Sequence, residues 1–335
     1  METGAPISVV MPVYNGGAHL DAAIRSIVEQ TWRDFEFVIL DDGSTDDTEA
    51  TLVRWASRDP RIRLARSAMR EGWGGSSDRV ARLATAPVCA RMDADDVAHP
   101  ERLARQWAVL REHPDVIMVG TLWEGIDDRG LRVRPRDRQV LLRHAAMTPF
   151  PHGSIMFRRA AFLEIGGYRR GAEAGEDQDL CRRMVRHGRV AVLVEALHQY
   201  RFHAGSTTRE LLSDATGRGL DQVAVSMAPP WRADAGDAPP LARPVEACRE
   251  RALYYAIACL VWAGERPGVG ALRSVARTGL STPGAFKAAL LTAGAWLSPA
   301  AARLVMRLAL RARDRRAGRL LGPREMVDWE PPWAS

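Results

Sequence analysis

The chain has 335 residues, of which 46% are hydrophobic and 26% charged, so a large core can form and wholesale disorder is excluded. The net charge of +6 comes almost entirely from arginines interleaved with 41 acidic residues, and no nucleic-acid-reading motif accompanies them, so we expect no nucleic-acid partner. Four cysteines without CxxC spacing argue against a zinc ribbon or a disulfide scaffold and favour a reducing compartment.

Strand and helix patterns alternate through the first hundred residues. Runs of β-branched and apolar residues predict strands at 7–13, 35–40, 61–65 and 88–92. Apolar residues at helical spacing predict three helices: one at 18–30, one that runs through residues 52–56, and one at 76–84. Ser44 or Thr45 is expected to cap the second helix. Alternating strands and helices are typical of a mostly parallel sheet covered by helices on both faces.

The pattern changes further along the chain. Helices are predicted at 103–110, 160–165 and 176–187, and strands at 116–121 and 190–195; an apolar block at 153–157 leads into the helix at 160–165. The segment 226–245 is rich in proline and alanine, and the residues that follow it have a helical pattern to about residue 321. A chain of this length commonly forms two domains, and this proline-rich segment is the expected boundary between them.

Polar side chains follow three of the predicted strands. Tyr14 ends the first strand, Asp42 ends the second, and Asp93 and Asp95 end the fourth. Ligands of parallel sheets bind outside the carboxyl ends of the strands, so we expect these side chains to gather at one edge. Paired carboxylates there suit a hard divalent cation that also binds substrate phosphates, and a ring beside a carboxylate suits a nucleobase. Each pattern by itself is also ordinary turn and helix-cap chemistry.

The motifs, taken in order, resemble those of the family 2 glycosyltransferases, which are inverting enzymes of the GT-A fold that use nucleotide-diphosphate sugars. The matching segments are VVMPVYN at 9–15, QTW at 30–32, VILDDGSTD at 38–46, MDADD at 92–96, PHGSIMFRR at 151–159, GGY at 166–168, EDQDL at 176–180 and YRFHAGS at 200–206. The resemblance covers about residues 6–210. It implies an α/β GT-A domain at 1–225, with a nucleotide-sugar half at about 1–100 and an acceptor half at about 101–225, then a linker at 226–245 and a helical C-terminal region at 246–335.

The resemblance also implies roles for single residues. The donor-binding set is Pro12, Tyr14, Asp42 and Asp93; the residues assigned to Mg²⁺ or Mn²⁺ are Asp95 and His203; the general base is Asp177. Asp42 and Tyr14 would hold the base, most often uracil. In an inverting transfer one carboxylate deprotonates the acceptor hydroxyl, and the metal stabilises the departing diphosphate.

The implied function is transfer of a hexose or N-acetylhexosamine from a UDP-sugar to a hydroxyl of a glycan, a lipid-linked molecule or another acceptor, in the synthesis of a surface polysaccharide, a glycolipid or a cell-wall glycan. Two alternatives stay open: a sugar nucleotidyltransferase, and a non-catalytic module that binds a nucleotide sugar. The sequence departs from the family at Asp78, where asparagine is frequent, and at Cys181, where tryptophan is usual.

The ends of the chain bear on its location. No secretory signal is visible at residues 1–6, and the longest uncharged runs, 252–264 and 288–302, are shorter than a membrane-spanning helix. Arg303, Arg307 and Arg311 share one helical face, which predicts either peripheral contact with an anionic membrane or an ordinary helix whose arginines face water. We therefore expect a cytoplasmic protein, and the alternative is a location at the inner face of the membrane.

Overall fold

The computed structural model describes residues 5–130, 150–169, 176–203 and 326–328. The chain divides into two compact units, and the first contains nearly all described residues: 5–124, 150–169, 176–201 and 326–328. The described residues of the second unit are 125–130 and 202–203. The predicted linker at 226–245 and the predicted C-terminal helices lie outside the described residues. None of the helices in the described ranges combines the length and the apolar character that crossing a membrane requires.

One half of the sheet is parallel, and its strands run in the order β3-β2-β1-β4. The strands are β1 (Ile7–Val13), β2 (Phe35–Asp41), β3 (Ile62–Arg66) and β4 (Val88–Arg91). The helices between them are α1 (Leu20–Val28), preceded by a 3₁₀ turn at Gly17–His19, α2 (Thr48–Ala56) and α3 (Gly72–Leu83). Residue 7 of β1 is paired with residue 35 of β2 and residue 88 of β4, so these strands end close together at one edge.

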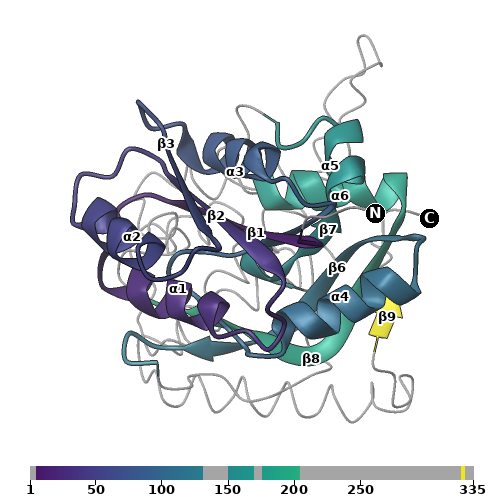
Figure 1. Ribbon diagram of the computed structural model, residues 1–335. Coiled ribbons are helices and arrows are strands. Elements are labelled where there is room, and N and C mark those ends of the chain that lie inside the picture. Colours follow the sequence, from purple (N-terminus) through teal and green to yellow (C-terminus); the bar gives the residue numbers. More distant parts are fainter. Residues whose placement is uncertain (1–4, 131–149, 170–175, 204–325, 329–335) are drawn as a thin grey trace, which may run out of the picture. The chain divides into compact units, whose positions relative to one another are not determined.

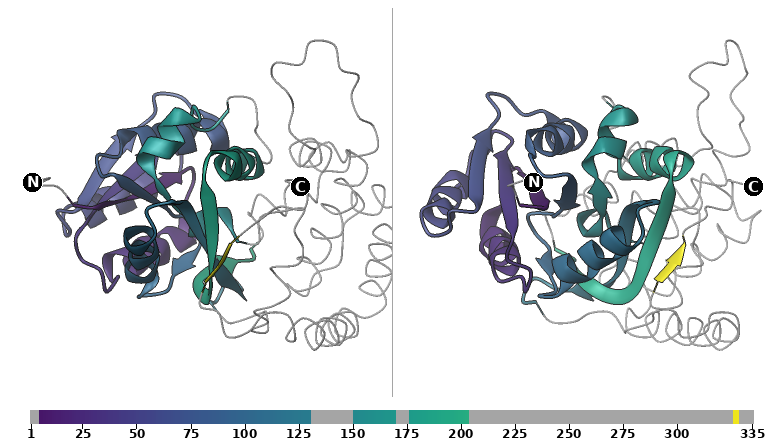
Figure 2. Two further views of the ribbon diagram at one scale, coloured as in Figure 1. Left: turned by 90° about the vertical axis from the view of Figure 1, so that its right-hand side faces the viewer. Right: turned by 45° about the vertical axis from the view of Figure 1, so that its right-hand side comes forward.

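The other half continues the sheet in the order β7-β6-β8-β5. The strand pairs β4–β7, β6–β7 and β5–β8 are antiparallel. Its strands are β5 (Val97–Ala98), β6 (Val116–Ile126), β7 (Met156–Arg158) and β8 (Arg189–Arg201), and β9 (Met326–Asp328) pairs with β8. Its helices are α4 (Arg102–Glu112), α5 (Arg159–Glu164) and α6 (Glu176–His187), and a 3₁₀ turn lies at His152–Ser154. Strand β8 bends along its length, and β9 lies beside it (Figure 2).

Helices cover both faces of the sheet. α1, α2 and α4 lie on one face, and α3, α5 and α6 lie on the other (Figure 1). The core on the first face joins β1 side chains such as Val9 and Met11 to Ile24 and Ile27 of α1 and to Leu103 of α4. The central strand β1 is buried on both sides, which explains why its sequence is a continuous apolar run rather than an alternating one.

The predicted fold class is confirmed: the described part is an α/β sheet with helices on both faces, and its first four strands in sheet order are parallel. The two-residue strand β5 and the distant strand β9 were not predicted, because neither is long enough to give a periodic signal. The predicted cap of the second helix was wrong. The Ser44 hydroxyl instead accepts the backbone N–H of Asn15 at 2.9 Å, and the first turn of α2 is bound by Asp46.

Candidate active site

The loops that follow β1 and β2 hold each other through backbone N–H groups. Three successive donors of the first loop reach side chains of the second: Asn15 to Ser44 at 2.9 Å, Gly16 to Thr48 at 2.9 Å and Gly17 to Asp46 at 3.2 Å. Asn15 adopts a positive φ of 49°, a conformation that asparagine tolerates well. This reciprocal pairing fixes the carboxyl ends of β1 and β2 beside each other.

Asp42 and Tyr14 lie at this edge. Asp42 is buried, and its two carboxylate oxygens accept the backbone N–H groups of Glu71 (2.8 Å) and Gly72 (3.1 Å) at the start of α3. Burial raises the pKa of the Asp42 carboxyl, and these two hydrogen bonds counteract part of that rise. A carboxylate has about four lone-pair sites, so it keeps acceptor capacity for a further N–H. The Tyr14 ring is 37% exposed, with the guanidinium of Arg70 4.0 Å from its centroid.

Pro12, the other residue predicted to bind the donor in this half, lies in β1 opposite Leu40 of β2 and is half-buried. As a proline it donates no ladder hydrogen bond. It directly precedes Val13, whose carbonyl accepts the N–H of Asp42 at 2.8 Å. Pro12 thus belongs to the strand end that supports both Tyr14 and Asp42.

Asp93 lies at the end of β4 and is paired with a buried arginine. Arg91 Nη1 is 2.7 Å from Asp93 Oδ1, and Arg91 is 6% exposed. Burial by itself raises the pKa of the Asp93 carboxyl, but Arg91, His152 and His198 together lower it more, so its pKa lies below the ordinary value. The other oxygen of Asp93 faces Gly153, where a Cβ would come within 2.5 Å of it. Because glycine has no side chain, residue 153 leaves room for the Asp93 carboxylate.

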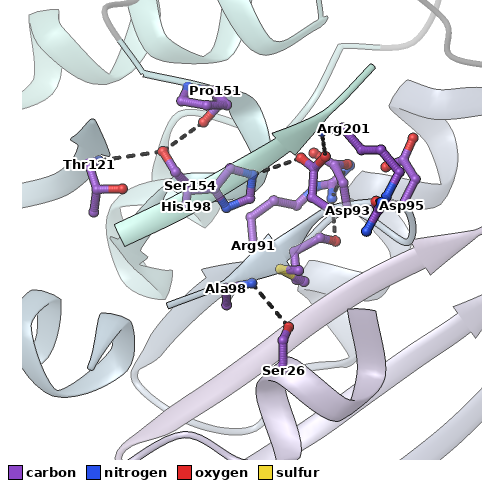
Figure 3. Close-up of polar contacts among 12 residues, drawn as sticks. Ser26, Arg91, Asp93, Asp95, Ala98, Thr121, Pro151, Ser154, His198 and Arg201 are labelled. Atoms are coloured by element: carbon purple, nitrogen blue, oxygen red, sulfur yellow. Dashed lines mark hydrogen bonds and ion pairs between the residues drawn. The ribbon is translucent and has the colours of Figure 1, made fainter. Parts of the chain in front are cut away.

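The three acids of the β4 loop have different surroundings. Asp93 and Asp95 (Figure 3) are half-buried, whereas Asp96 is 1% exposed and is bound by β8. Carboxylate oxygens are the ligands that Mg²⁺ and Mn²⁺ take, and half-buried carboxylates retain access for a cation and a phosphate. The donor set therefore fits a divalent cation at Asp95 beside Asp93, while Asp96 is already bound within the protein.

Asp177 lies in the first turn of α6, far along the chain from Asp93. Its Oδ1 accepts the backbone N–H of Gln178 at 2.7 Å, and its Oδ2 accepts the Gln178 side-chain amide at 3.2 Å. Burial raises the pKa of the Asp177 carboxyl, and the negative charge of Asp93 raises it further. The fold therefore brings the predicted base near the Asp93 carboxylate. A carboxylate with a raised pKa is a better proton acceptor than a solvent-exposed one.

Polar residues that the sequence analysis did not single out lie beside α6: Tyr168 is buried, and His152 and Glu176 are half-buried. His152 Nε2 and the Tyr168 hydroxyl are 2.5 Å apart, and His152 Nδ1 is 3.9 Å from Glu176. Burial and the nearby Arg91 lower the pKa of His152 to about 3, so the imidazole is neutral. His152 and Tyr168 occur in the PHG and GGY segments, which was the only signal in the sequence that could have indicated them.

The two departures from the family pattern have structural roles. Asp78 Oδ1 accepts the backbone N–H of Tyr168 at 3.0 Å, and Asp78 Oδ2 binds Arg82 at 2.7 Å, so this residue holds the GGY segment against α3. Burial raises the pKa of the Cys181 thiol well above its ordinary value, which keeps the thiol neutral and fits a packing role. His203 follows β8, is half-buried and belongs to the second unit, so its role as a metal ligand stays a prediction.

Solved structures share this architecture. TarS 1–349 of S. aureus, in complex with UDP-GlcNAc, matches with a TM-score of 0.55 and 18% identity over 81% of this chain and 83% of that one. The mannosyltransferase PcManGT of Pyrobaculum calidifontis, in complex with GDP-Man and Mn²⁺, matches with a TM-score of 0.57 and 22% identity over 94% of this chain and 88% of that one. The fold of the chain is thus the GT-A fold.

Sequence comparison identifies the family. The model of "Glycosyl transferase family 2" matches residues 8–169. EpsE of Bacillus subtilis, assigned to the glycosyltransferases, is 34% identical over 60% of this chain and 74% of its own length. The amylovoran biosynthesis glycosyltransferase AmsE of Erwinia amylovora is 30% identical over 59% of this chain and 76% of its own length, and the O-antigen biosynthesis glycosyltransferase WbnJ of Escherichia coli is 29% identical over 62% and 84%. The chain belongs to glycosyl transferase family 2.

Proposed function

We propose that this glycosyltransferase transfers a hexosyl or N-acetylhexosaminyl group from a UDP-sugar to an acceptor hydroxyl, with inversion at the anomeric carbon and with a bound Mg²⁺ or Mn²⁺. The observation that carries the proposal is that Asp177 lies near enough to Asp93 for the charge of Asp93 to contribute to the raised pKa of Asp177. The acceptor is a growing surface polysaccharide or its lipid-linked precursor. The names of AmsE and WbnJ, which refer to amylovoran and O-antigen synthesis, support this choice.

The donor base is assigned to Asp42 and Tyr14. Asp42 accepts a hydrogen bond from a ring N–H of the base, and the ring of Tyr14 stacks on the base once the Arg70 guanidinium has moved aside. Uracil and guanine both present such an N–H, and the two structural neighbours were solved with UDP-GlcNAc and GDP-Man. The nucleobase is therefore the part of the proposal that the experiment below tests most directly.

The diphosphate end is assigned to Asp95 and Asp93, with His203 as a further metal ligand. When bound, the cation supplies positive charge against the departing diphosphate. The pairing of Asp93 with Arg91 at 2.7 Å favours the ionised carboxylate, the form that orients a ribose hydroxyl or a metal-bound water. PcManGT was solved with Mn²⁺, which supports the choice of ion.

Asp177 is assigned the role of general base. It takes the proton from the acceptor hydroxyl as that oxygen attacks the anomeric carbon from the face opposite the leaving diphosphate. Gln178 binds both oxygens of Asp177 and so restricts the orientation of the carboxylate at the start of α6. Inversion requires a single displacement, so no protein nucleophile is needed, in agreement with a neutral Cys181 thiol.

The nucleotidyltransferase alternative is less well supported. Such an enzyme needs free backbone N–H groups in a glycine-rich loop near the first strand to hold phosphates. Here the N–H groups of Asn15, Gly16 and Gly17 all donate to side chains of the next loop. A non-catalytic binding module would not need the raised pKa at Asp177, and turnover of the donor by the purified protein distinguishes it.

The first test is thermal stabilisation by UDP, GDP and dTDP, each with and without Mn²⁺. Ligand at 100 times its dissociation constant adds about 2.7 kcal/mol, which for a domain of this size raises the melting temperature by about 5–10 °C. We expect a shift with UDP that needs Mn²⁺, is reversed by a chelator and is lost in Asp95→Asn. Glu112→Gln removes an equally negative but exposed charge from the end of α4 and is the matched control.

The outcomes separate the parts of the proposal. A shift limited to GDP or dTDP keeps the donor site and overturns the uracil assignment. A shift with UDP that is equal with and without Mn²⁺ overturns the metal assignment. Absence of any shift, with a folded wild-type protein, overturns the donor site. The anomeric configuration of the product, read by NMR from a reaction with UDP-sugars, tests inversion separately.

A further inference from the structure

A buried polar layer lies behind the Asp93 and Asp95 carboxylates, where β8 meets the loop after β4 (Figure 3). His198 and Asp96 are 0% and 1% exposed, and His198 Nε2 lies 2.7 Å from Asp96 Oδ2. The other carboxylate oxygen of Asp96 accepts the backbone N–H of Arg201 at 2.8 Å. Both oxygens of Asp96 are therefore bound by the same strand, β8.

Arg201 extends this attachment to the neighbouring residue. Its side-chain Nε donates to the backbone carbonyl of Asp95 at 2.8 Å, while its own backbone N–H holds Asp96. Asp95 is thus bound through its backbone carbonyl and Asp96 through its carboxylate, from two positions on β8 that are three residues apart. A displacement of this backbone would carry the Asp95 carboxylate with it, because that side chain has only two rotatable bonds.

The charges around His198 explain why it suits this place. Burial lowers the pKa of His198 to about 3, and the arginines Arg102 and Arg91 lower it as well. Burial likewise raises the pKa of Asp96 well above its ordinary value, and Asp95 and Asp93 add to the rise. Within the described ranges, His198 Nδ1 has no hydrogen-bond partner, so Nε2 carries the whole polar contact of the ring.

We propose that His198 and Arg201 are positioning residues that fix the backbone of residues 95 and 96 and thereby orient the Asp95 carboxylate toward the divalent cation. The inference rests on the proposed donor site, because that site assigns Asp95 to the cation. Partners that orient a metal ligand typically account for 10–100-fold in metal affinity, although they do not touch the metal. A purely packing role for His198 would instead tolerate an apolar side chain of similar volume.

The test is calorimetric titration of Mn²⁺ into protein saturated with UDP, or with GDP if wild type selects GDP. His198→Leu keeps most of the volume and removes the polar contact, and we expect Mn²⁺ affinity to fall about 10-fold or more. His198→Gln keeps an amide that can donate to or accept from Asp96, and its Mn²⁺ affinity should stay close to the wild-type value. Leu197→Ala is the matched control, because it removes a buried side chain of β8 that belongs to the hydrophobic core.

Each result decides the inference. Unchanged Mn²⁺ affinity in His198→Leu overturns it, and so does an equal loss in Leu197→Ala, which would assign the effect to general packing. If His198→Leu does not fold, Arg201→Met carries the test, since it keeps the aliphatic stem and removes the Nε contact with Asp95; the expected loss is again about 10-fold. A wild type that binds no nucleoside diphosphate with Mn²⁺ overturns the proposed function and this inference together, whereas normal wild-type binding with an unaffected His198→Leu overturns the inference alone.

Discussion

The two halves of the sheet hold their polar residues by different means. In the parallel half, the loops after β1 and β2 bind each other through backbone N–H groups and small side chains such as Ser44 and Thr48. In the antiparallel half, His198 and Arg201 reach the β4 loop from within a strand, and their contacts are almost completely buried. A loop contact costs about one hydrogen bond when it is lost, whereas a buried charged contact leaves an unpaired group and costs more.

The proposed division of labour follows these halves: the parallel half binds the nucleotide, and α6 of the antiparallel half supplies the base. Asp177→Asn tests the division with the largest expected effect, because it removes the proton acceptor and leaves the donor site unchanged. We expect kcat to fall about 10³-fold, while the UDP and Mn²⁺ affinities stay at wild-type values. Steady-state kinetics and the thermal-shift titration measure the two quantities, and a parallel loss of donor affinity would contradict the division.

Gly153→Ala tests the place where the halves meet. A Cβ at this position would lie 2.5 Å from Asp93 Oδ2 and 3.0 Å from His198 Cε1, so the carboxylate must move. Displacing a binding group by about 1 Å can cost on the order of 10²-fold, and we expect a loss of this size in kcat/KM for the nucleotide sugar. Circular dichroism and the melting temperature report whether the fold is kept. Normal kinetics in this variant would show that Asp93 does not need its present position.

The acidic limb of the pH–rate profile tests the environment of Asp177. Burial and the charge of Asp93 raise the pKa of the carboxyl, and a general base works only when it is deprotonated. The rate should therefore fall tenfold per pH unit below a pKa that lies above the ordinary value for aspartate. Tyr168 and Cys181 are further titratable groups nearby, because the charge of Asp177 raises the pKa of each. A limb at the ordinary aspartate value would contradict the effect of partial burial and of Asp93 on the pKa of Asp177.

Ser44→Ala gives the smallest expected effect and tests the loop pairing of the parallel half. It removes the acceptor of the Asn15 N–H, so we expect a loss of about 1 kcal/mol in unfolding free energy and a correspondingly weaker UDP affinity. Ser57→Ala is the control, because the Ser57 hydroxyl binds the carbonyl of Arg54 on an exposed part of α2. If Ser44→Ala and Ser57→Ala lose the same amount of UDP affinity, the hydrogen bonds between the two loops have no special part in nucleotide binding.

The halves also differ in how far the sequence predicts them. Tyr14, Asp42, Asp93 and Asp95 each directly follow an apolar strand of a βαβ pattern, so their common edge follows from parallel topology alone. His198 gave no such signal: its partner Asp96 is distant in sequence, and their contact depends on the register of the two-residue strand β5 against β8. The fully buried Arg102 was likewise not predicted, because a buried arginine depends on carbonyl partners that only the folded chain supplies.

Local context misled the prediction at Ser44 for a related reason. A serine just before a helix is a good cap in isolation, but here a second loop offers the N–H of Asn15, and tertiary contact takes precedence over the local one. The motif resemblance was more informative than periodicity for Asp177, since an acidic first turn is common in helices without any catalytic role.

The contact of Phe150 with Gly120 bears on how the enzyme could be re-engineered. A Cβ at residue 120 would overlap the Phe150 ring, so the ring packs there only because β6 has a glycine at this position. Chimeras that exchange only the segment between residues 130 and 150 with that of a relative would keep this anchor intact. Such grafts would leave the strands and loops to which the donor site is assigned unchanged.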